Sequence, residues 1–163
     1  MLRSLKIATA FFVALLGLLH VLGNLANLEA AIGFVGAVTA GSEQPFYTLY
    51  GPPAMSRVLH GLALALILAG ELAVAGLASA AVFMMLKNRS ADAQLFAAAT
   101  RPAVAACAVG MLVWFGIFIV VGEGYFMIWQ TAAGAGPIAG AMRYGTVCGL
   151  FMVFLLLAPD SDP

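Results

Sequence analysis

The chain has 163 residues, of which 64% are hydrophobic and only 9% are charged. A soluble domain carries about 25% charged residues, so this composition excludes a water-exposed globular protein and indicates an integral membrane protein. Seven basic and seven acidic side chains cancel, and a net charge of zero provides no basic face for nucleic acid.

Four apolar runs are long enough to cross a bilayer, which takes about 20 helical residues. Together they predict an all-α membrane protein in which residues 1–163 form one transmembrane domain. We expect four transmembrane helices that alternate in direction and form an up-down-up-down bundle. The expected spans are residues 7–28, 57–86, 102–124 and 138–158.

The first span contains Thr9 near its start and a polar stripe at its end. His20, Asn24 and Asn27 follow one another at spacings of four and three residues, which places them on one helix face. Polar side chains inside a membrane favour a neighbouring helix or water over lipid. We therefore expect this face to be turned toward the bundle.

Residues 28–40, LEAAIGFVGAVTA, are apolar but follow directly on the polar stripe. They fit either a prolongation of the first span or an extra interfacial helix in the first outer loop, and both interpretations stay open. The loop after them contains Phe46, Tyr47 and Tyr50, which suit the headgroup layer, where aromatic side chains gather. We expect this loop to close the bundle, with a lid over a ligand as the alternative.

Glu71 interrupts the second apolar run near its middle. It follows Arg57 by 14 residues, which places it about 21 Å into the span and past the midplane of a ~30 Å hydrocarbon core. A charge there costs at least about 2.5–3.5 kcal/mol, so we expect a neutral carboxyl that faces the bundle and bonds Thr9. A bond that fixes helix register is the preferred interpretation, and a proton-handling or quinone-contacting carboxyl is the alternative.

His60 lies four residues into the same run, at a depth comparable to that of His20 by helical rise alone. Two neutral imidazoles with small neighbours can ligate a haem b. Hydrogen-bonded or water-facing histidines are the preferred interpretation, and a haem site at His20 and His60 is the alternative. No cofactor or metal is predicted otherwise.

Small residues repeat every three or four positions in the second and third spans, where they predict close helix packing. In the second span they are Ala69, Ala73, Gly76 and Ala80, and in the third they are Ala103, Ala106 and Gly110. Cys107 and Cys148 lie in separate apolar runs without metal-ligand spacing, and they fit small core residues.

Aromatic side chains mark the end of the third span. Trp114 lies near its middle, whereas Tyr125 and Trp129 lie at or past its outer end, as expected of an aromatic belt. Glu123 can cap the span, pair with Arg143 at the start of the fourth span, or contact a partner. These five residues are candidates for interface, lipid or quinone contacts.

Lys and Arg are unevenly distributed between the two sides of the predicted bundle. The side that holds both termini receives Arg3, Lys6, Lys87, Arg89 and Arg101, and the other side receives only Arg57 and Arg143. Cytoplasmic loops carry an excess of Lys and Arg. We therefore expect both termini to be cytoplasmic.

Four motifs carry a resemblance to a known family: RSLKIA at the start, NLANLEA, GELAVAG with Glu71, and VWFGIFIVVGEGYFMIWQT. Over nearly its whole length the chain resembles a bacterial family of predicted small integral membrane proteins, a domain of unknown function. The family pattern YFxMWQ is YFMIWQ here, and it does not include His20 or His60. The resemblance implies four spans and a multi-pass location in the bacterial inner membrane, and it implies no reaction.

The sequence contains no Ser/His/Asp set, phosphate-binding loop or metal-ligand spacing, which favours a protein that is not an enzyme. The preferred function is that of a small accessory subunit of an inner-membrane respiratory or other redox complex, in assembly or stability. Its partners would be lipid and either other membrane subunits or a second copy. An electron-transfer protein that binds haem b or a quinone is the first alternative, and a small proton-coupled transporter with Glu71 as its titrating group is the second.

Overall fold

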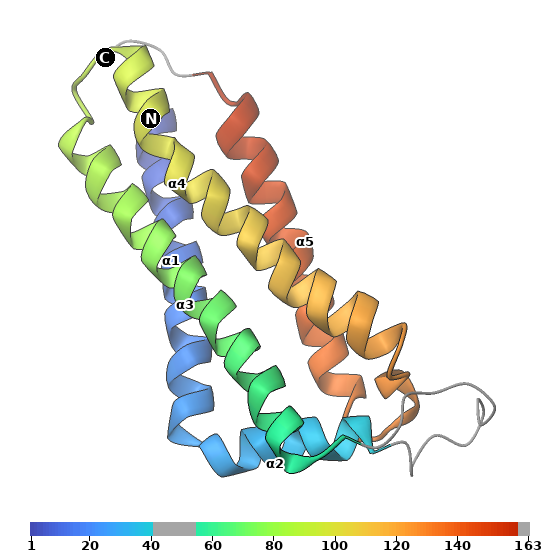
Figure 1. Cartoon of the computed structure of the whole chain (residues 1–163). Coiled ribbons are helices and arrows are strands. Elements are labelled where there is room, and N and C mark those ends of the chain that lie inside the picture. Colours follow the sequence, from blue (N-terminus) through green and yellow to red (C-terminus); the bar gives the residue numbers. More distant parts are fainter. Residues whose placement is uncertain (41–54, 160–163) are drawn as a thin grey trace.

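The structure, a computed structural model, describes residues 1–40 and 55–159, and these ranges contain helices and no β-strand (Figure 1). The predicted all-helical architecture is therefore confirmed. The elements in chain order are α1 (Leu2–Ala26), α2 (Leu28–Thr39), α3 (Arg57–Lys87), α4 (Ala93–Met111), the π-helix η1 (Leu112–Glu123), the short 3₁₀ helix η2 (Ile128–Gln130) and α5 (Ala135–Leu157).

Four helical segments are long and apolar enough to cross a membrane, as the sequence predicted. They are α1, α3, the continuous helix that α4 and η1 form over Ala93–Glu123, and α5. The second and fourth segments lie close to their expected bounds, whereas α1 begins at Leu2, before the apolar run itself.

The third span begins nine residues earlier than predicted, at Ala93 instead of residue 102. Asp92 caps this start, because its carboxylate accepts a hydrogen bond of 2.8 Å from the Leu95 backbone N–H. Pro102 consequently lies inside α4, where it removes one backbone donor. The prediction was wrong because the capping aspartate starts the helix before the apolar run begins.

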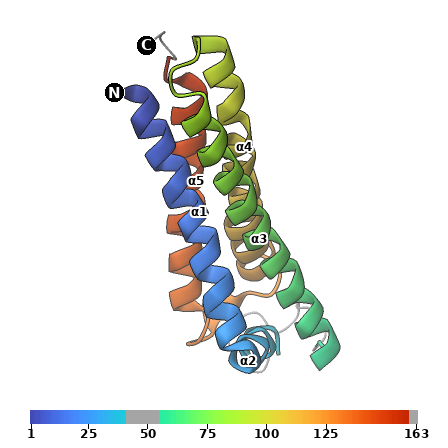
Figure 2. The ribbon, with the colours of Figure 1, turned by 90° about the vertical axis from the view of Figure 1, so that its left-hand side faces the viewer.

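Long-range hydrogen bonds define one end of the bundle, called here the terminal end. Arg3 donates to the backbone carbonyls of Arg89 at 2.9 Å and Ala91 at 2.6 Å. Lys6 is only 1% exposed and donates to the carbonyl of Ala158 at 2.8 Å. The start of α1, the turn between α3 and α4, and the end of α5 therefore meet at this end, and successive long helices run in opposite directions (Figures 1 and 2).

The segment that the sequence left open, residues 28–40, forms a helix of its own. The chain turns at Asn27, whose backbone leaves the helical region at φ −124° and ψ 40°. From there α2 lies across the opposite end of the bundle, called here the α2 end (Figures 1 and 2). An ion pair between Glu29 and Arg57 connects α2 to the start of α3. The loop aromatics Phe46, Tyr47 and Tyr50 lie outside the described residues.

The core lies between the four long helices and consists largely of small side chains, which let helix backbones approach closely. A close backbone approach joins α1 to α3 at Gly17. A Cβ atom added to Gly17 would lie 2.8 Å from both the backbone nitrogen of Ala75 and the carbonyl oxygen of Glu71. Gly17 therefore marks the point of α1 that is level with Glu71.

The predicted packing stripe was right for α4 and wrong for α3. In α4 the three small residues are buried, as expected. In α3 the predicted stripe lies on the outer side, where Ala69, Gly76 and Ala80 are exposed. The buried positions of α3 are instead Leu64, Ile67, Glu71, Val74, Ala75, Ala78, Ala81 and Met85. A helix that is apolar on every side offers no polar face to distinguish its inner surface.

Candidate functional site

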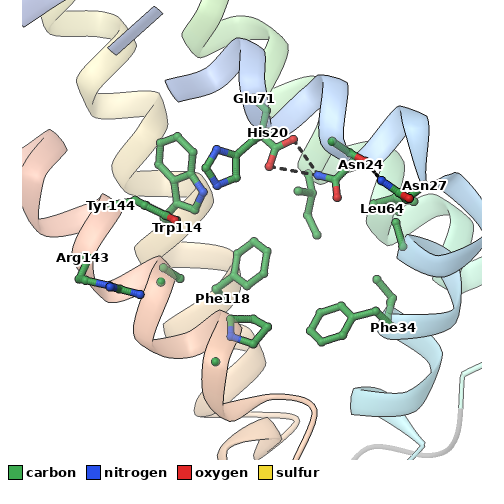
Figure 3. Close-up of a pocket in the computed structure, with 18 residues that line it drawn as sticks. His20, Asn24, Asn27, Phe34, Leu64, Glu71, Trp114, Phe118, Arg143 and Tyr144 are labelled. Atoms are coloured by element: carbon green, nitrogen blue, oxygen red, sulfur yellow. Dashed lines mark hydrogen bonds between the residues drawn. The ribbon is translucent and has the colours of Figure 1, made fainter. Parts of the chain in front are cut away.

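A cleft of about 490 Å³ opens inside the bundle, near the α2 end (Figure 3). Helices α1, α3, η1 and α5 form its walls, and α2 contributes Ala31, Phe34 and Val35. The polar and aromatic side chains that line it are His20, Asn24, Asn27, Glu71, Trp114, Phe118, Arg143 and Tyr144, together with Phe34. A polar cleft among membrane-spanning helices is unusual, because lipid cannot satisfy its hydrogen-bonding groups.

Glu71 is 1% exposed and hydrogen-bonds Asn24 of α1 inside this cleft. The Asn24 amide donates to the two carboxyl oxygens of Glu71 at 3.1 and 3.4 Å (Figure 3). The expectation that Glu71 faces another helix therefore agrees with the geometry. Asn24, which the sequence placed on a separate polar stripe, is its partner.

The predicted partner Thr9 was wrong. Gly17 is level with Glu71, and Thr9 lies eight residues, or about 12 Å of helical rise, nearer the terminal end. Side chains of a helix also lean toward its N-terminus, and the N-terminus of α3 lies at the α2 end. The carboxyl of Glu71 therefore reaches toward Asn24 and away from Thr9.

His20 is held in an aromatic cage beside Glu71. Its ring centroid lies 5.4 Å from that of Trp114 and 4.9 Å from that of Tyr144, both in edge-to-face geometry. Its Nδ1 lies 2.9 Å from the carbonyl oxygen of Leu16. Because a carbonyl only accepts, Nδ1 is the protonated nitrogen, and the neutral ring then has an Nε2 that can accept a hydrogen bond.

His20 and His60 do not come together, so the predicted pairing was wrong. His60 contacts α2: a Cβ atom on Gly36 would lie 3.0 Å from its Nδ1. Its Nε2 is buried and has no hydrogen-bond partner in the described part of the chain. Measured from the contact between Gly17 and α3, the two histidines differ by about 12 Å along the bundle. They cannot ligate one iron atom, and no group of three His, Cys, Asp or Glu within the described residues is placed to hold a metal ion.

Trp114 and Tyr144 bring two hydrogen-bond donors to the cleft. Trp114 is 2% exposed, so the sequence interpretation of a lipid contact does not hold for it. Neither the indole N–H of Trp114 nor the hydroxyl of Tyr144 hydrogen-bonds another described residue, although both rings line the cleft (Figure 3). Tyr144 was not among the predicted site residues, although the rule used for Glu71 applies to it, because its hydroxyl also lies within an apolar span.

The remaining candidate residues lie nearer the α2 end. Tyr125 and Trp129 are 43% and 42% exposed, which fits the aromatic belt that the sequence predicted. Arg143 donates to the carbonyl of Ala139 at 3.1 Å within α5. No ion pair joins Glu123 to Arg143 within the described residues. Asn27, which follows α1, donates to the carbonyl of Gly23 at 2.9 Å, in the last turn of that helix.

These features define the class: a helical integral membrane protein with a polar cleft between its spans. The chain belongs to the family described as "Predicted small integral membrane protein (DUF2165)", which matches residues 2–158. The family resemblance seen in the sequence is therefore confirmed. No curated protein and no solved structure matches the chain.

Proposed function

We propose that the protein binds the ring-shaped polar head of a lipid-soluble molecule of the quinone class in the cleft between its helices. The observation that carries this proposal is the pair of donors, the Trp114 indole and the Tyr144 hydroxyl, that line the cleft without a partner within the described residues. Both side chains line the cleft, where an acceptor on a bound molecule can reach these donors. The two carbonyl oxygens of a quinone are acceptors that can satisfy both.

The volume and walls of the cleft suit such a ring. Ligand sites typically enclose about 300–1,000 Å³ and combine apolar walls with a few placed polar groups, and this cleft measures about 490 Å³. Phe34 and Phe118 supply flat apolar surfaces (Figure 3), against which a ring packs edge-to-face or offset. Glu71 and Asn24 lie on the opposite wall, where a second polar group of the ligand would meet them.

A binding measurement on the protein in lipid nanodiscs tests this function. In a Trp129→Phe background Trp114 is the one remaining tryptophan, and its fluorescence should be quenched saturably by a tail-less benzoquinone. Tyr144→Phe removes only the hydroxyl, so it should raise the Kd about three- to tenfold, the usual worth of one hydrogen bond. The matched control Tyr125→Phe removes a hydroxyl outside the cleft and should leave the Kd unchanged. Quenching that does not saturate, or equal Kd values for the two variants, would refute the proposal.

We further propose that the terminal end faces the cytoplasm. Lys87 and Arg89 lie at that end together with Arg3 and Lys6, and an excess of basic residues favours the cytoplasmic side. A cysteine at Ser90, in the exposed turn between α3 and α4, should react with an impermeant thiol reagent only after the membrane is opened. If the reagent labels this cysteine in intact cells or spheroplasts, the terminal end faces away from the cytoplasm and the proposed orientation is wrong.

The role of an accessory subunit in a larger redox complex remains a prediction from the sequence, as does the role of a proton-coupled transporter. Purification from the native membrane in a mild detergent tests the first, because a subunit should copurify with its complex. Reconstituted vesicles test the second, because Glu71→Gln should abolish a proton-coupled flux.

A further inference from the structure

A second, apolar cavity of about 100 Å³ lies under α2, beside the cleft. Its walls include Val38 of α2, Ala63 of α3, and Ile117 and Val121 of η1. The hydroxyl of Thr39, which also lines it, is already bonded to the carbonyl of Val35 at 2.6 Å. The Thr39 hydroxyl is therefore not available to a ligand, and the cavity offers mainly hydrocarbon surface.

The cleft and the apolar cavity are neighbours, because four side chains belong to both. Phe34, Val35, Ile67 and Phe118 line each of them. Two of these, Phe34 and Phe118, appear in Figure 3 on the side of the cleft away from His20 and Glu71. A molecule that lay across this boundary would meet hydrogen-bonding groups on one side and only hydrocarbon on the other.

We propose that the apolar cavity holds the first part of a hydrocarbon tail whose polar head occupies the cleft. This inference rests on the proposed function and specifies its ligand: a ring with an attached aliphatic chain, and not a tail-less ring. The cavity has room for roughly three groups of the size of water at about 30 Å³ each, which corresponds to about the first three carbon groups of the tail. The remainder of a longer tail would continue into lipid.

The cavity contributes selectivity more than affinity. Lipid tails are as apolar as the cavity wall, so moving a ligand tail from the bilayer into the protein brings no hydrophobic gain. What it brings is contact with closely fitting walls and a fixed direction for the ring. A tail also raises the amount of ligand dissolved in the bilayer, so the Kd values of two ligands on one protein cannot be compared directly. The Kd of each ligand must instead be compared between protein variants.

Ala63→Leu is the variant that tests this arrangement. Ala63 lines the apolar cavity and not the polar cleft, so the larger leucine side chain would occupy the cavity. Its matched control is Ala65→Leu, the same change two residues further along α3 at an exposed position. The probes are a benzoquinone without a tail and the same ring with one five-carbon isoprenoid unit, and each Kd is measured in nanodiscs.

The expected result is a selective loss. Ala63→Leu should raise the Kd of the tailed ring at least about fivefold, the lower limit for overfilling a packed site, and should change the Kd of the tail-less ring less than about twofold. Ala65→Leu should change neither. Should Ala63→Leu not fold, Val121→Phe, at a 43% exposed position on the rim of the cavity, should produce the same selective loss.

The outcomes separate the two proposals. If both rings bind the parent protein and the cavity variants leave the tailed ring unaffected, or weaken both rings equally, the tail site is wrong and the quinone-class head site stands. If neither ring binds saturably, the proposed function is wrong and the tail site falls with it.

Discussion

The hydrogen bond between Asn24 and Glu71 should be a measurable part of the stability of the bundle. Asn24→Leu keeps the approximate size of the side chain and removes the amide that donates to both carboxyl oxygens, at 3.1 and 3.4 Å. The carboxyl of Glu71 remains at a position that is 1% exposed, and no other described side chain hydrogen-bonds it.

The expected magnitude follows from the place of this bond between two membrane helices. Hydrogen bonds of this kind average about 0.6 kcal/mol and reach about 1.7 kcal/mol, and leaving a buried polar group unsatisfied costs about 1–3 kcal/mol. We expect Asn24→Leu to lower the free energy of unfolding by about 1–2 kcal/mol, since the adjoining cleft gives water some access to the carboxyl. The double variant Asn24→Leu/Glu71→Leu should lose less than the sum of the two single variants, by about 0.6–1.7 kcal/mol.

Equilibrium unfolding in mixed detergent micelles measures these free energies for the parent, both single variants and the double variant. Asn27→Leu is the matched control, because the Asn27 side chain bonds only the carbonyl of Gly23 in the last turn of α1 and is exposed. It should change the free energy of unfolding by no more than about 0.5 kcal/mol. A coupling energy between Asn24 and Glu71 that falls within about 0.3 kcal/mol of zero would mean that the two side chains do not interact.

Three further predictions concern the packing of the helices. Gly17→Ala should lower the free energy of unfolding by about 1–3 kcal/mol, because its Cβ would press on two backbone atoms of α3 at 2.8 Å. The control Gly76→Ala, where an added Cβ meets nothing within 4 Å, should be neutral in the same unfolding assay, and equal effects would contradict the close approach. Lys6→Met should cost about 1.5–3 kcal/mol through loss of a charged donor to the end of α5, and an unchanged unfolding midpoint would refute this. Cys107 and Cys148 are free and fully buried, so N-ethylmaleimide should label them only after unfolding, and rapid labelling of the folded protein would place them elsewhere.

The number of membrane-spanning helices was predictable because it depends on a strong local signal. A long run of apolar residues is costly in water and, in lipid, must satisfy its backbone within itself, so such a run becomes a helix. The bounds of these helices were less predictable. Asp92 starts α4 through one capping bond, and Pro102 within the helix was mistaken for its beginning.

The inner face of α3 was not predictable from spacing. Nearly every position of α3 is apolar, so Ala69 and Gly76 on the outside look the same in sequence as Ala75 and Ala78 on the inside. Only contact with α1 and α4 distinguishes the two faces. The direction of Glu71 was predictable for the opposite reason, because its carboxyl is the one group of α3's apolar middle that lipid cannot accommodate.

The sequence by itself determined that this is a helical membrane protein with four helices long and apolar enough to span the bilayer, and that Glu71 faces the protein interior. Both follow from the transfer of single residues between water and lipid. The tertiary structure alone decided that Asn24 meets Glu71, that His20 and His60 stay apart, and that Tyr144 joins the cleft. These depend on the level at which one helix lies beside another. That level is set by the backbone contact at Gly17 and by α2 lying across the end of the bundle. Neither contact can be derived from the spacing of residues along any one helix.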